Sequence, residues 1–407
     1  MPSVAVDADF EADLQLDDAV RFPHPLSPGA IRPREVLLTG GTGFLGAYLL
    51  SELMHRTEAN VHCLVRAADS RAARERIVDH LRSYDLYRDA FGGRIHAIAG
   101  DVSQPRLGLS ADAFRDLAER IDQIYHSGGR TNMVLPYERL RPPNVLGCLE
   151  VLRLAGAAST KPVHFVSSIA VLLNEIDTRA DRLRETGRPH PHASLKGAYS
   201  RTKCVAEWLV WQASERGLPV TIHRPVRITG DSRTGAIRDN SDILPVVWKA
   251  CILLRRFPAA DIPVTMAPVD YVSRAMIQLT GRQTSWGHAY HYATGQPIAW
   301  RRLMAATRSL GYPLREVGWD EWWQELKERA RPGSSDPNDR KSFLATARLA
   351  LTAPQFLFYS RPPVDTTQAR EGLAGSGIEC PPFDEALIAK YVDYWRQTGF
   401  LPEPATL

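Results

Sequence analysis

Short apolar runs separated by helix-like stretches recur through the first half of the chain. Runs of this length, with apolar residues at successive positions, are typical of strands that a parallel sheet buries on both faces. Six of them stand out, at residues 36–38, 60–66, 95–102, 121–125, 163–166 and 220–225. Between the first two, Tyr48, Leu49 and Leu53 recur at helical spacing. This alternation predicts an α/β fold, a Rossmann-like doubly wound parallel sheet whose ligands bind beyond the carboxyl ends of the strands.

The pattern differs at both ends of this region. Residues 1–33 combine six acidic side chains with a proline-rich run and predict a linker or N-terminal arm, either a solvated tail or a segment docked on the surface. Residues 34–235 are predicted to form the sheet domain, to which later segments near 265–295 return. Residues 236–407 predict a smaller, mostly helical C-terminal subdomain on the ligand side, with helices at 243–254 and 319–326 and a loop-like interruption at 331–340.

The first strand leads directly into a glycine-rich turn, Thr-Gly-Gly-Thr-Gly-Phe-Leu-Gly at residues 39–46. Gly40 and Gly41 allow a tight turn with positive backbone angles, Gly43 allows a pyrophosphate to approach the main chain, and Gly46 allows the helix to sit close to the sheet. Free amides at the start of the following helix favour an anion. A glycine turn alone is weak evidence, but the strand before it and the amphipathic helix after it predict a dinucleotide site.

The second and third strands end in residues suited to the adenosine half of a dinucleotide. Folds of this type that prefer NAD place an acid after the second strand, whereas a 2'-phosphate requires a cation. Arg66 at this point therefore predicts NADP. Arg76, on the next helix, either gives a second contact or belongs to a solvated arginine face. Asp101, at the tip of the third strand, either meets an adenine amine or closes a turn.

Candidate catalytic groups follow the fifth strand. Ser167 and Ser168 stand at its carboxyl end, and Tyr199 and Lys203 lie four residues apart at the start of a predicted helix. That spacing puts the phenol and the ammonium on one helix face, where the cation favours ionisation of a phenol whose free pKa is about 10. We predict that Ser168 donates to a carbonyl oxygen, Tyr199 supplies a proton and NADPH supplies a hydride, with Ser167 as the adjacent alternative to Ser168.

Composition and charge narrow the remaining classes. The chain has 407 residues, of which 44% are hydrophobic and 24% charged, and its net charge of +4 is too small to indicate a nucleic-acid partner. Its five cysteines are scattered, so we predict reduced thiols and no metal site. No apolar run is long enough to span a bilayer, and the N-terminus lacks the pattern of a secretion signal, so we expect a cytoplasmic protein without membrane contact.

The glycine turn and the Tyr199–Lys203 motif resemble the extended short-chain dehydrogenase/reductase family. The chain is more narrowly similar to the thioester reductase branch, the terminal reductase domains of nonribosomal peptide and polyketide synthases and of carboxylic acid reductases. That similarity runs from the linker to the C-terminus and is carried by residues 64–67, 100–102, 136–137, 144–147, 166–168, 224–235, 268–272 and 399–402.

The resemblance implies the activity, the partner and the site residues. Members of this branch use NADPH to release an acyl or peptidyl thioester, held on the phosphopantetheine arm of a carrier protein, as an aldehyde or, after a second hydride, an alcohol. The implied catalytic residues are Ser168, Tyr199 and Lys203. The implied NADP contacts are Thr39, Gly40, Thr42, Gly43, Phe44, Leu45, Gly46, Arg66, Arg76, Asp101, Val102, Ser127, Gly128, Ser167, Tyr199, Lys203, Val226 and Ile228. A monomer, or a part of a megasynthase, is expected.

Some positions depart from the family pattern, and other functions stay open. Ser168 stands where threonine is usual, Thr131 where valine is usual, and Val226 where glycine is common; the last two bear on the shape of the nicotinamide pocket. One alternative is an extended reductase or epimerase that acts on a free carbonyl or a nucleotide sugar. Another is a non-enzymatic NADP-sensing regulator, although such proteins typically lose the tyrosine and lysine kept here.

Overall fold

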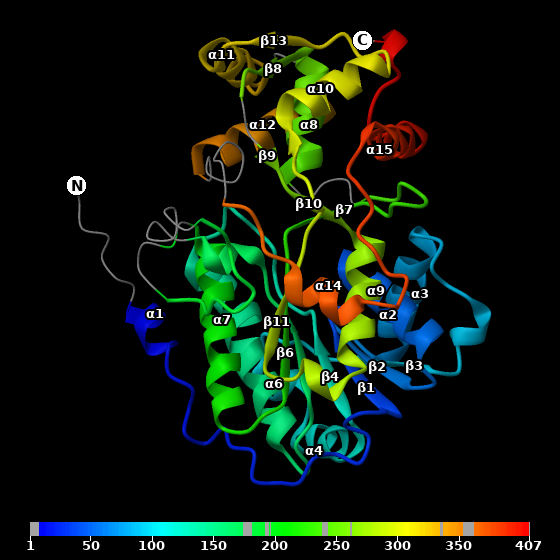
Figure 1. Ribbon diagram of the computed structural model, residues 1–407, viewed down its shortest axis with the longest axis vertical. Coiled ribbons are helices and arrows are strands. Elements are labelled where there is room, and N and C mark those ends of the chain that lie inside the picture. The colour runs from blue at the N-terminus through cyan, green and yellow to red at the C-terminus, as the bar shows by residue number, and fades with distance from the viewer. Residues whose placement is uncertain are drawn as a thin grey trace.

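A seven-stranded, all-parallel sheet forms the centre of the protein in the computed structural model (Figure 1). The structure describes residues 8–173, 181–191, 195, 197–237, 243–260, 263–333, 337–352 and 362–406. The strands lie in the order β11-β6-β5-β4-β1-β2-β3. Their bounds are β1 Glu35–Thr39, β2 Asn60–Val65, β3 Ile95–Ala99, β4 Gln123–His126, β5 Val163–Val166, β6 Val220–Pro225 and β11 His288–Tyr292. This is the predicted doubly wound order, and the reversal between β1 and β4 opens a crevice at the carboxyl ends of the strands.

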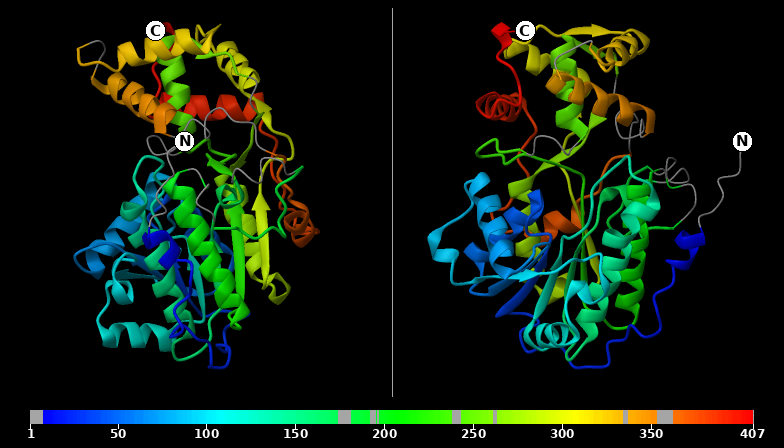
Figure 2. Two further views of the ribbon diagram at one scale, coloured as in Figure 1. Left: turned by 90° about the vertical axis from the view of Figure 1, so that its left-hand side faces the viewer. Right: turned by 180° about the vertical axis from the view of Figure 1, so that it is seen from behind.

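Helices cover both faces of the sheet, as the two side views show (Figure 2). The core on one face is built from α2 (Phe44–Arg56), α3 (Ser70–Ser83) and α9 (Val269–Thr280). The core on the other face is built from α4 (Ala111–Arg120), α5 (Tyr137–Arg141), α6 (Gly147–Gly156) and α7 (Ala198–Glu215). Side chains of β1 alternate between these cores, because successive residues of a strand point to opposite faces. Leu38 packs on the first and Leu37 on the second.

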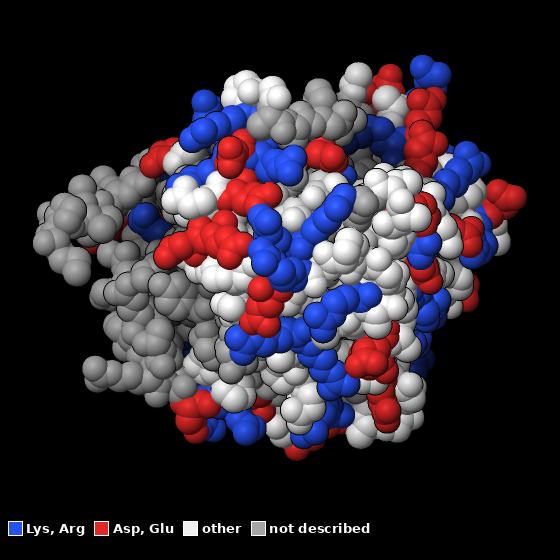
Figure 3. Space-filling view, turned by 90° about the horizontal axis from the view of Figure 1, so that it is seen from above, with Lys and Arg blue, Asp and Glu red and all other residues white. Residues whose placement is uncertain are grey.

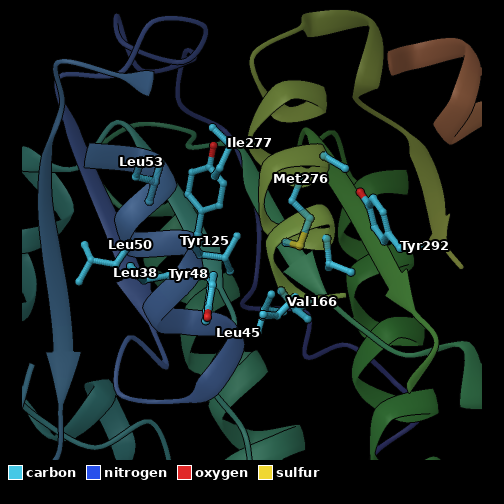
Figure 4. Packing of buried hydrophobic residues seen from close by; sticks show 14 of the residues in the cluster. Leu38, Leu45, Tyr48, Leu50, Leu53, Tyr125, Val166, Met276, Ile277 and Tyr292 are labelled. Atoms are coloured by element: carbon cyan, nitrogen blue, oxygen red, sulfur yellow. The ribbon is translucent and has the colours of Figure 1, made fainter. Parts of the chain in front are cut away.

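Figure 4 shows how α2 and α9 pack together on the first face. Leu45, Tyr48 and Leu53 of α2 and Met276 of α9 are buried in one cluster. The ring of Tyr125, from β4, is buried with them, and its hydroxyl shares a 2.7 Å hydrogen bond with Thr280 at the end of α9. Because α9 lies next to α2, the helix that follows the glycine turn is supported along its length by a segment from the second half of the chain.

A helical subdomain lies beyond the carboxyl ends of the strands and has a core of its own (Figure 1). Trp248, Trp322 and Trp395 are completely buried in this core. The subdomain is built from α8 (Ile243–Leu254), α10 (Trp300–Ser309), α11 (Trp319–Arg329), α12 (Pro337–Thr352) and α15 (Glu385–Gln397), with short strands β8 Arg256–Pro258, β9 Pro263–Val264, β12 Ile298–Ala299 and β13 Arg315–Val317. The predicted loop at 331–340 is too long, because α12 already begins at Pro337.

Two further segments connect the halves of the molecule. Short strands β7 (Arg227–Thr229) and β10 (Met266–Pro268) pair in parallel. The segment 265–295 then leads to the main domain through α9 and β11. Near the C-terminus, α14 (Thr367–Leu373) lies against the main domain, and the chain then returns to the helical subdomain at α15 (Figure 1).

The N-terminal arm is docked on the sheet domain over residues 10–33. Phe10, Leu16 and Val20 are buried in the core under α5, α6 and α7. Asp13 is also buried, and it accepts two hydrogen bonds of 2.7 Å from the guanidinium of Arg141 and one of 2.9 Å from the hydroxyl of Tyr137. The sequence left open a solvated tail or a segment docked on the surface. In the structure the segment is docked, because its apolar residues are buried in the core and its buried carboxylate pairs with an arginine.

Candidate active site

Two glycines of the turn between β1 and α2, Gly40 and Gly46, have no room for a side chain. Gly40 has a φ of +79°, and a Cβ on it would lie 2.6 Å from the carbonyl oxygen of Ser127. A Cβ on Gly46 would lie 1.9 Å from the carbonyl oxygen of Gly40. Helix α2 begins after Gly43 without a side-chain cap, so its first amides have no partner from that residue. This cradle of bare backbone at the positive end of a helix fits a dinucleotide pyrophosphate.

Thr39 joins the turn to the end of the neighbouring strand. Its hydroxyl shares a 2.7 Å hydrogen bond with Nδ1 of His126 and accepts one of 2.9 Å from the amide of Gly128. Burial, together with the charge of Lys203, lowers the pKa of His126 to about 3, so this imidazole is neutral at pH 7. These bonds hold Ser127 and Gly128, two of the implied NADP contacts, beside the glycine turn. A Cβ on Gly128 would lie 2.8 Å from the threonine oxygen, which explains the need for glycine.

The two predicted cofactor arginines lie together at the carboxyl end of β2. Arg66 directly follows this strand, and its side chain is exposed. Arg76 is exposed on α3, and its guanidinium donates a hydrogen bond to the main-chain carbonyl of Arg66. Two cations at the end of the strand next to β1 form a site that suits the phosphate of a nucleotide ribose.

Asp101 and Val102 lie beyond β3, on the same edge. The Asp101 carboxylate accepts hydrogen bonds from the amide and hydroxyl of Ser103, at 2.9 and 2.8 Å, and so closes a turn. Val102 is partly buried and lies beside Gly128 and Gly147. A Cβ on Gly147 would lie 2.8 Å from the carbonyl oxygen of Val102. These contacts bring the residues that follow β3 against Gly128, which follows β4.

Lys203 links the predicted catalytic helix to the end of β5. Its Nζ donates a 2.8 Å hydrogen bond to the carbonyl oxygen of Val166, the last residue of that strand. Lys203 is only 8% exposed, and burial lowers the pKa of its ammonium to about 8, against the opposing effects of Cys148 and Glu207. A lysine with this pKa is still largely protonated at pH 7 and can act on a neighbouring phenol or ribose.

The two serines after β5 have different surroundings. Ser167 is 2% exposed, and its hydroxyl donates to the carboxylate of Glu207 on α7. Ser168 is partly exposed, and its oxygen accepts a 3.2 Å hydrogen bond from the amide of Ala170 in the turn that follows. Ser168 thus has the more exposed of the two hydroxyls, whereas the hydroxyl of Ser167 is engaged with Glu207. Tyr199, at the N-terminal end of α7, is 8% exposed.

Comparison with known proteins identifies the family. Residues 38–276, more than half of the chain, match the model of the male sterility protein family. The terminal R domain of the myxalamid PKS-NRPS biosynthetic pathway has the same fold, with a TM-score of 0.90 and 39% sequence identity over 97% of this chain and 99% of that one. The chain belongs to this reductase family. The resemblance noted in the sequence is therefore confirmed.

Two further relatives give the extent of the reductase similarity. The reductase (R) domain of a nonribosomal peptide synthetase from Mycobacterium tuberculosis is 26% identical, with a TM-score of 0.73, and each chain covers 97% of the other. Isonitrile lipopeptide synthase from Streptomyces coeruleorubidus is 34% identical over 413 aligned positions, which cover 97% of this chain but 26% of that protein. The chain thus spans only a small part of this curated relative. The match to this NAD-binding family model indicates a nicotinamide cofactor.

The reductase site includes buried polar residues that the sequence did not reveal as functional. Asn144 lies in a π-helical turn, Pro142–Leu146, and its side chain holds the main chain of Arg130 through bonds of 2.6 and 3.2 Å. Its amide also donates to the hydroxyl of Thr202, at 3.0 Å. Asn144 therefore fixes the loop after β4 against the helix that carries Tyr199 and Lys203. A π-helical turn often marks a functional site, but it cannot be recognised from residue spacing alone.

Glu207 and Arg224 form a fully buried ion pair next to the serines. Three hydrogen bonds of 2.5 to 3.1 Å join the two side chains, and both are 0% exposed. Glu207 also accepts from Ser167 and, at 3.1 Å, from the indole of Trp211. A signal was present in the sequence: Glu207 follows Lys203 by four residues, and Arg224 stands in a strand predicted to be buried, where a charge requires a partner.

The remaining candidates lie at the rim of the site. Val226 is buried and its amide donates to the carbonyl of Tyr292 at 3.1 Å, while Ile228 in β7 is partly exposed. Two histidines flank Pro191 in the chain between Ser168 and Tyr199; His190 is exposed and His192 lies outside the described residues. Within the described part of the chain, no cluster of three metal-ligating side chains is found and no helix is long and apolar enough to cross a membrane.

Proposed function

We propose that this reductase uses NADPH to release a carrier-bound acyl or peptidyl thioester as an aldehyde. The observation that carries the proposal is the hydrogen bond from Lys203 to the carbonyl of Val166. This bond joins the start of α7 to the end of β5. It brings the helix that bears Tyr199 against the turn that bears Ser168, at the ligand end of the sheet. A phenol, a hydroxyl and a cation so arranged suit reduction of a carbonyl group.

NADPH is the proposed form of the cofactor because of Arg66 and Arg76. Arg66 directly follows β2, where an enzyme that prefers NAD carries an acid, and the guanidinium of Arg76 donates to its main-chain carbonyl. When bound, NADPH supplies the hydride, which adds to the carbonyl carbon of the thioester. The chain's residues must then bind the substrate, stabilise the oxygen and move one proton.

Each catalytic residue has a separate task in this proposal. Ser168 donates a hydrogen bond to the carbonyl oxygen as negative charge develops on it. Tyr199 protonates that oxygen, which gives a hemithioacetal, and the charge of Lys203 favours the resulting phenolate. Collapse of the hemithioacetal breaks the carbon–sulfur bond and returns a proton to the departing thiolate. The products are an aldehyde and the free phosphopantetheine thiol, and a second hydride would give the alcohol.

The carrier protein is proposed from the family alone. In the face seen from above, basic and acidic residues lie side by side (Figure 3). Arg256 pairs with Glu321 and Glu325, and Arg315 also pairs with Glu321. Because these charges are already neutralised, we expect the phosphopantetheine arm to supply more of the recognition than surface charge does.

The decisive experiment follows thiol release and aldehyde formation from an acyl-pantetheine thioester. We expect the wild type to consume one NADPH for each thiol released when reduction stops at the aldehyde, and Tyr199→Phe to abolish both. Tyr87→Phe is a matched control, since this half-buried ring packs near Arg82 and takes no part in the site. NADPH oxidation without thiol release, or reduction of small free carbonyls alone, would reject thioester reduction.

A further inference from the structure

A buried polar network leads from the active site to the far edge of the sheet. Its first part is the Ser167–Glu207–Arg224 series described above. Arg224 continues it, because its guanidinium donates to the carbonyl oxygens of Glu185 at 3.3 Å and Gly187 at 2.7 Å. These two residues belong to the segment 181–191, which lies in the sequence between the catalytic Ser168 and Tyr199. The inner side of this segment is therefore held by the ion pair beneath the catalytic turn.

The carboxylate of Glu185 holds the outer side of the segment. Glu185 is 1% exposed and accepts three main-chain hydrogen bonds, from the amides of His291 at 2.8 Å, Gln368 at 2.6 Å and Ala369 at 3.1 Å. The first donor lies on β11, the edge strand, and the other two lie in the first turn of α14. Both places leave backbone amides without a partner in their own element. One buried carboxylate thus joins three separate parts of the chain.

Main-chain hydrogen bonds also join the segment 181–191 to residues near the start of α14. The amide of Leu183 donates to the carbonyl of Pro363 at 2.8 Å, and the amide of Asp365 donates to the carbonyl of Leu183 at 2.9 Å. We call residues 362–373 the C-terminal strap. At its far end the chain leads to α15, where the hydroxyl of Tyr391 donates to the carbonyl of Gly230 at 2.7 Å (Figure 1). The strap therefore connects the helical subdomain to the segment between the catalytic residues.

We propose that Glu185 is a positioning residue for the reductase, a role that rests on the function proposed above. Its carboxylate fixes the segment 181–191 between the strap and Arg224. Because Arg224 also pairs with Glu207, which lies on the helix of Tyr199 and accepts from the hydroxyl of Ser167, the position of the segment affects where Ser168 and Tyr199 lie relative to each other. The helical subdomain, through the strap, thereby influences the geometry of the catalytic groups.

Kinetic analysis of Glu185→Gln tests the positioning role. The carboxamide has one acceptor oxygen in place of two, and its NH2 group would face amide donors. We expect kcat to fall at least about tenfold, since a misplacement of about 1 Å can cost a hundredfold, while KM for NADPH stays within about twofold. Glu371→Gln is the matched control, because this carboxylate lies exposed on the same helix, α14. A folded Glu185→Gln protein with unchanged kcat, or with a change in KM alone, would overturn the proposal.

Hydrogen exchange provides a test that does not depend on turnover. In Glu185→Gln we expect faster amide exchange in residues 181–191 and in the turn at 168–172, with no change in Glu371→Gln. If the wild type fails to reduce thioesters, the proposed function fails while this measurement still decides whether the contact positions the catalytic turn. Should Glu185→Gln not fold, Glu185→Asp keeps the charge but shortens its reach, and the same two changes are expected in smaller degree. Unaltered exchange at 168–172 in a folded variant would contradict the proposal.

Discussion

Replacement of Lys203 by methionine should make the protein more stable and inactive. The ammonium is buried, and its pKa falls from the ordinary 10.5 to about 8, which corresponds to about 3 kcal/mol in favour of the neutral amine. Because the folded pKa lies below the unfolded one, this cost is fully present below pH 8 and is relieved as the pH rises from about 8 to about 10.5. Methionine removes the cost but also loses the hydrogen bond to Val166, worth about 1 kcal/mol.

The expected difference in unfolding free energy therefore depends on pH. Lys203→Met should be about 2 kcal/mol more stable than the wild type at pH 7, and this advantage should vanish near pH 10. Denaturant unfolding of both proteins at the two pH values measures it, because the other titrating groups are shared and His126, which Lys203 affects, has a pKa of about 3 and does not titrate between them. Lys327→Met, at an exposed lysine on α11, should show no such pH dependence. A Lys203→Met protein that is less stable at pH 7, or a difference that is constant with pH, would refute this reasoning.

Three further changes test other parts of the site and fold. Gly46→Ala forces a shift of the glycine turn and should weaken cofactor binding at least about tenfold in a titration, whereas Gly93→Ala, where a Cβ would meet nothing within 4 Å, should have no effect. Arg66→Gln should raise KM for NADPH by about tenfold or more and leave KM for NADH nearly unchanged, since one charge-assisted contact to the 2'-phosphate is lost. Asp13→Asn should lower the unfolding free energy by about 1–3 kcal/mol, because its arginine partner on α5 keeps an unneutralised charge; Asp18→Asn, at an exposed acid, should not.

Most of the sheet was predictable because its strands are local patterns. Residues 36–38 and 163–166 are apolar at nearly every position, and parallel strands buried on both faces require this. The edge strand β11 was harder to predict, since its sequence, His288 to Tyr292, mixes imidazole and phenol groups with alanine. His291 and Tyr292 are buried and bond to the carbonyl of Asp365 and to His223, which lie far away in the sequence. Such long-range partners cannot be read from one strand.

The catalytic pair was predictable for the same local reason, while its support was not. Tyr199 and Lys203 share a helix face by spacing alone. The burial of Glu207 and Arg224 depends on how α7, β5 and β6 pack. The Glu185 carboxylate is bonded by backbone amides of α14, almost 200 residues downstream. Sequence spacing identifies residues within one element, whereas a network that joins several elements appears only once the chain is folded.

The N-terminal arm shows how charge can hide a core contact. Its acids dominate the sequence and are typical of a solvated segment. Phe10, Leu16 and Val20 are nevertheless buried, and the centre of the Phe10 ring lies 4.5 Å from the guanidinium of Arg201, two residues from Tyr199. Three scattered apolar residues have no regular period, so only the complementary surface on α5 and α7 explains why this arm is docked.

The most direct test of the central claim uses NADPH that carries deuterium at the transferable C4 position, together with an acyl-pantetheine thioester. Thioester reduction predicts one deuterium on the aldehyde carbon, one thiol released for each aldehyde formed, and the loss of both in Tyr199→Phe. Unlabelled aldehyde, or labelled product that still forms at the wild-type rate in Tyr199→Phe, would contradict the account.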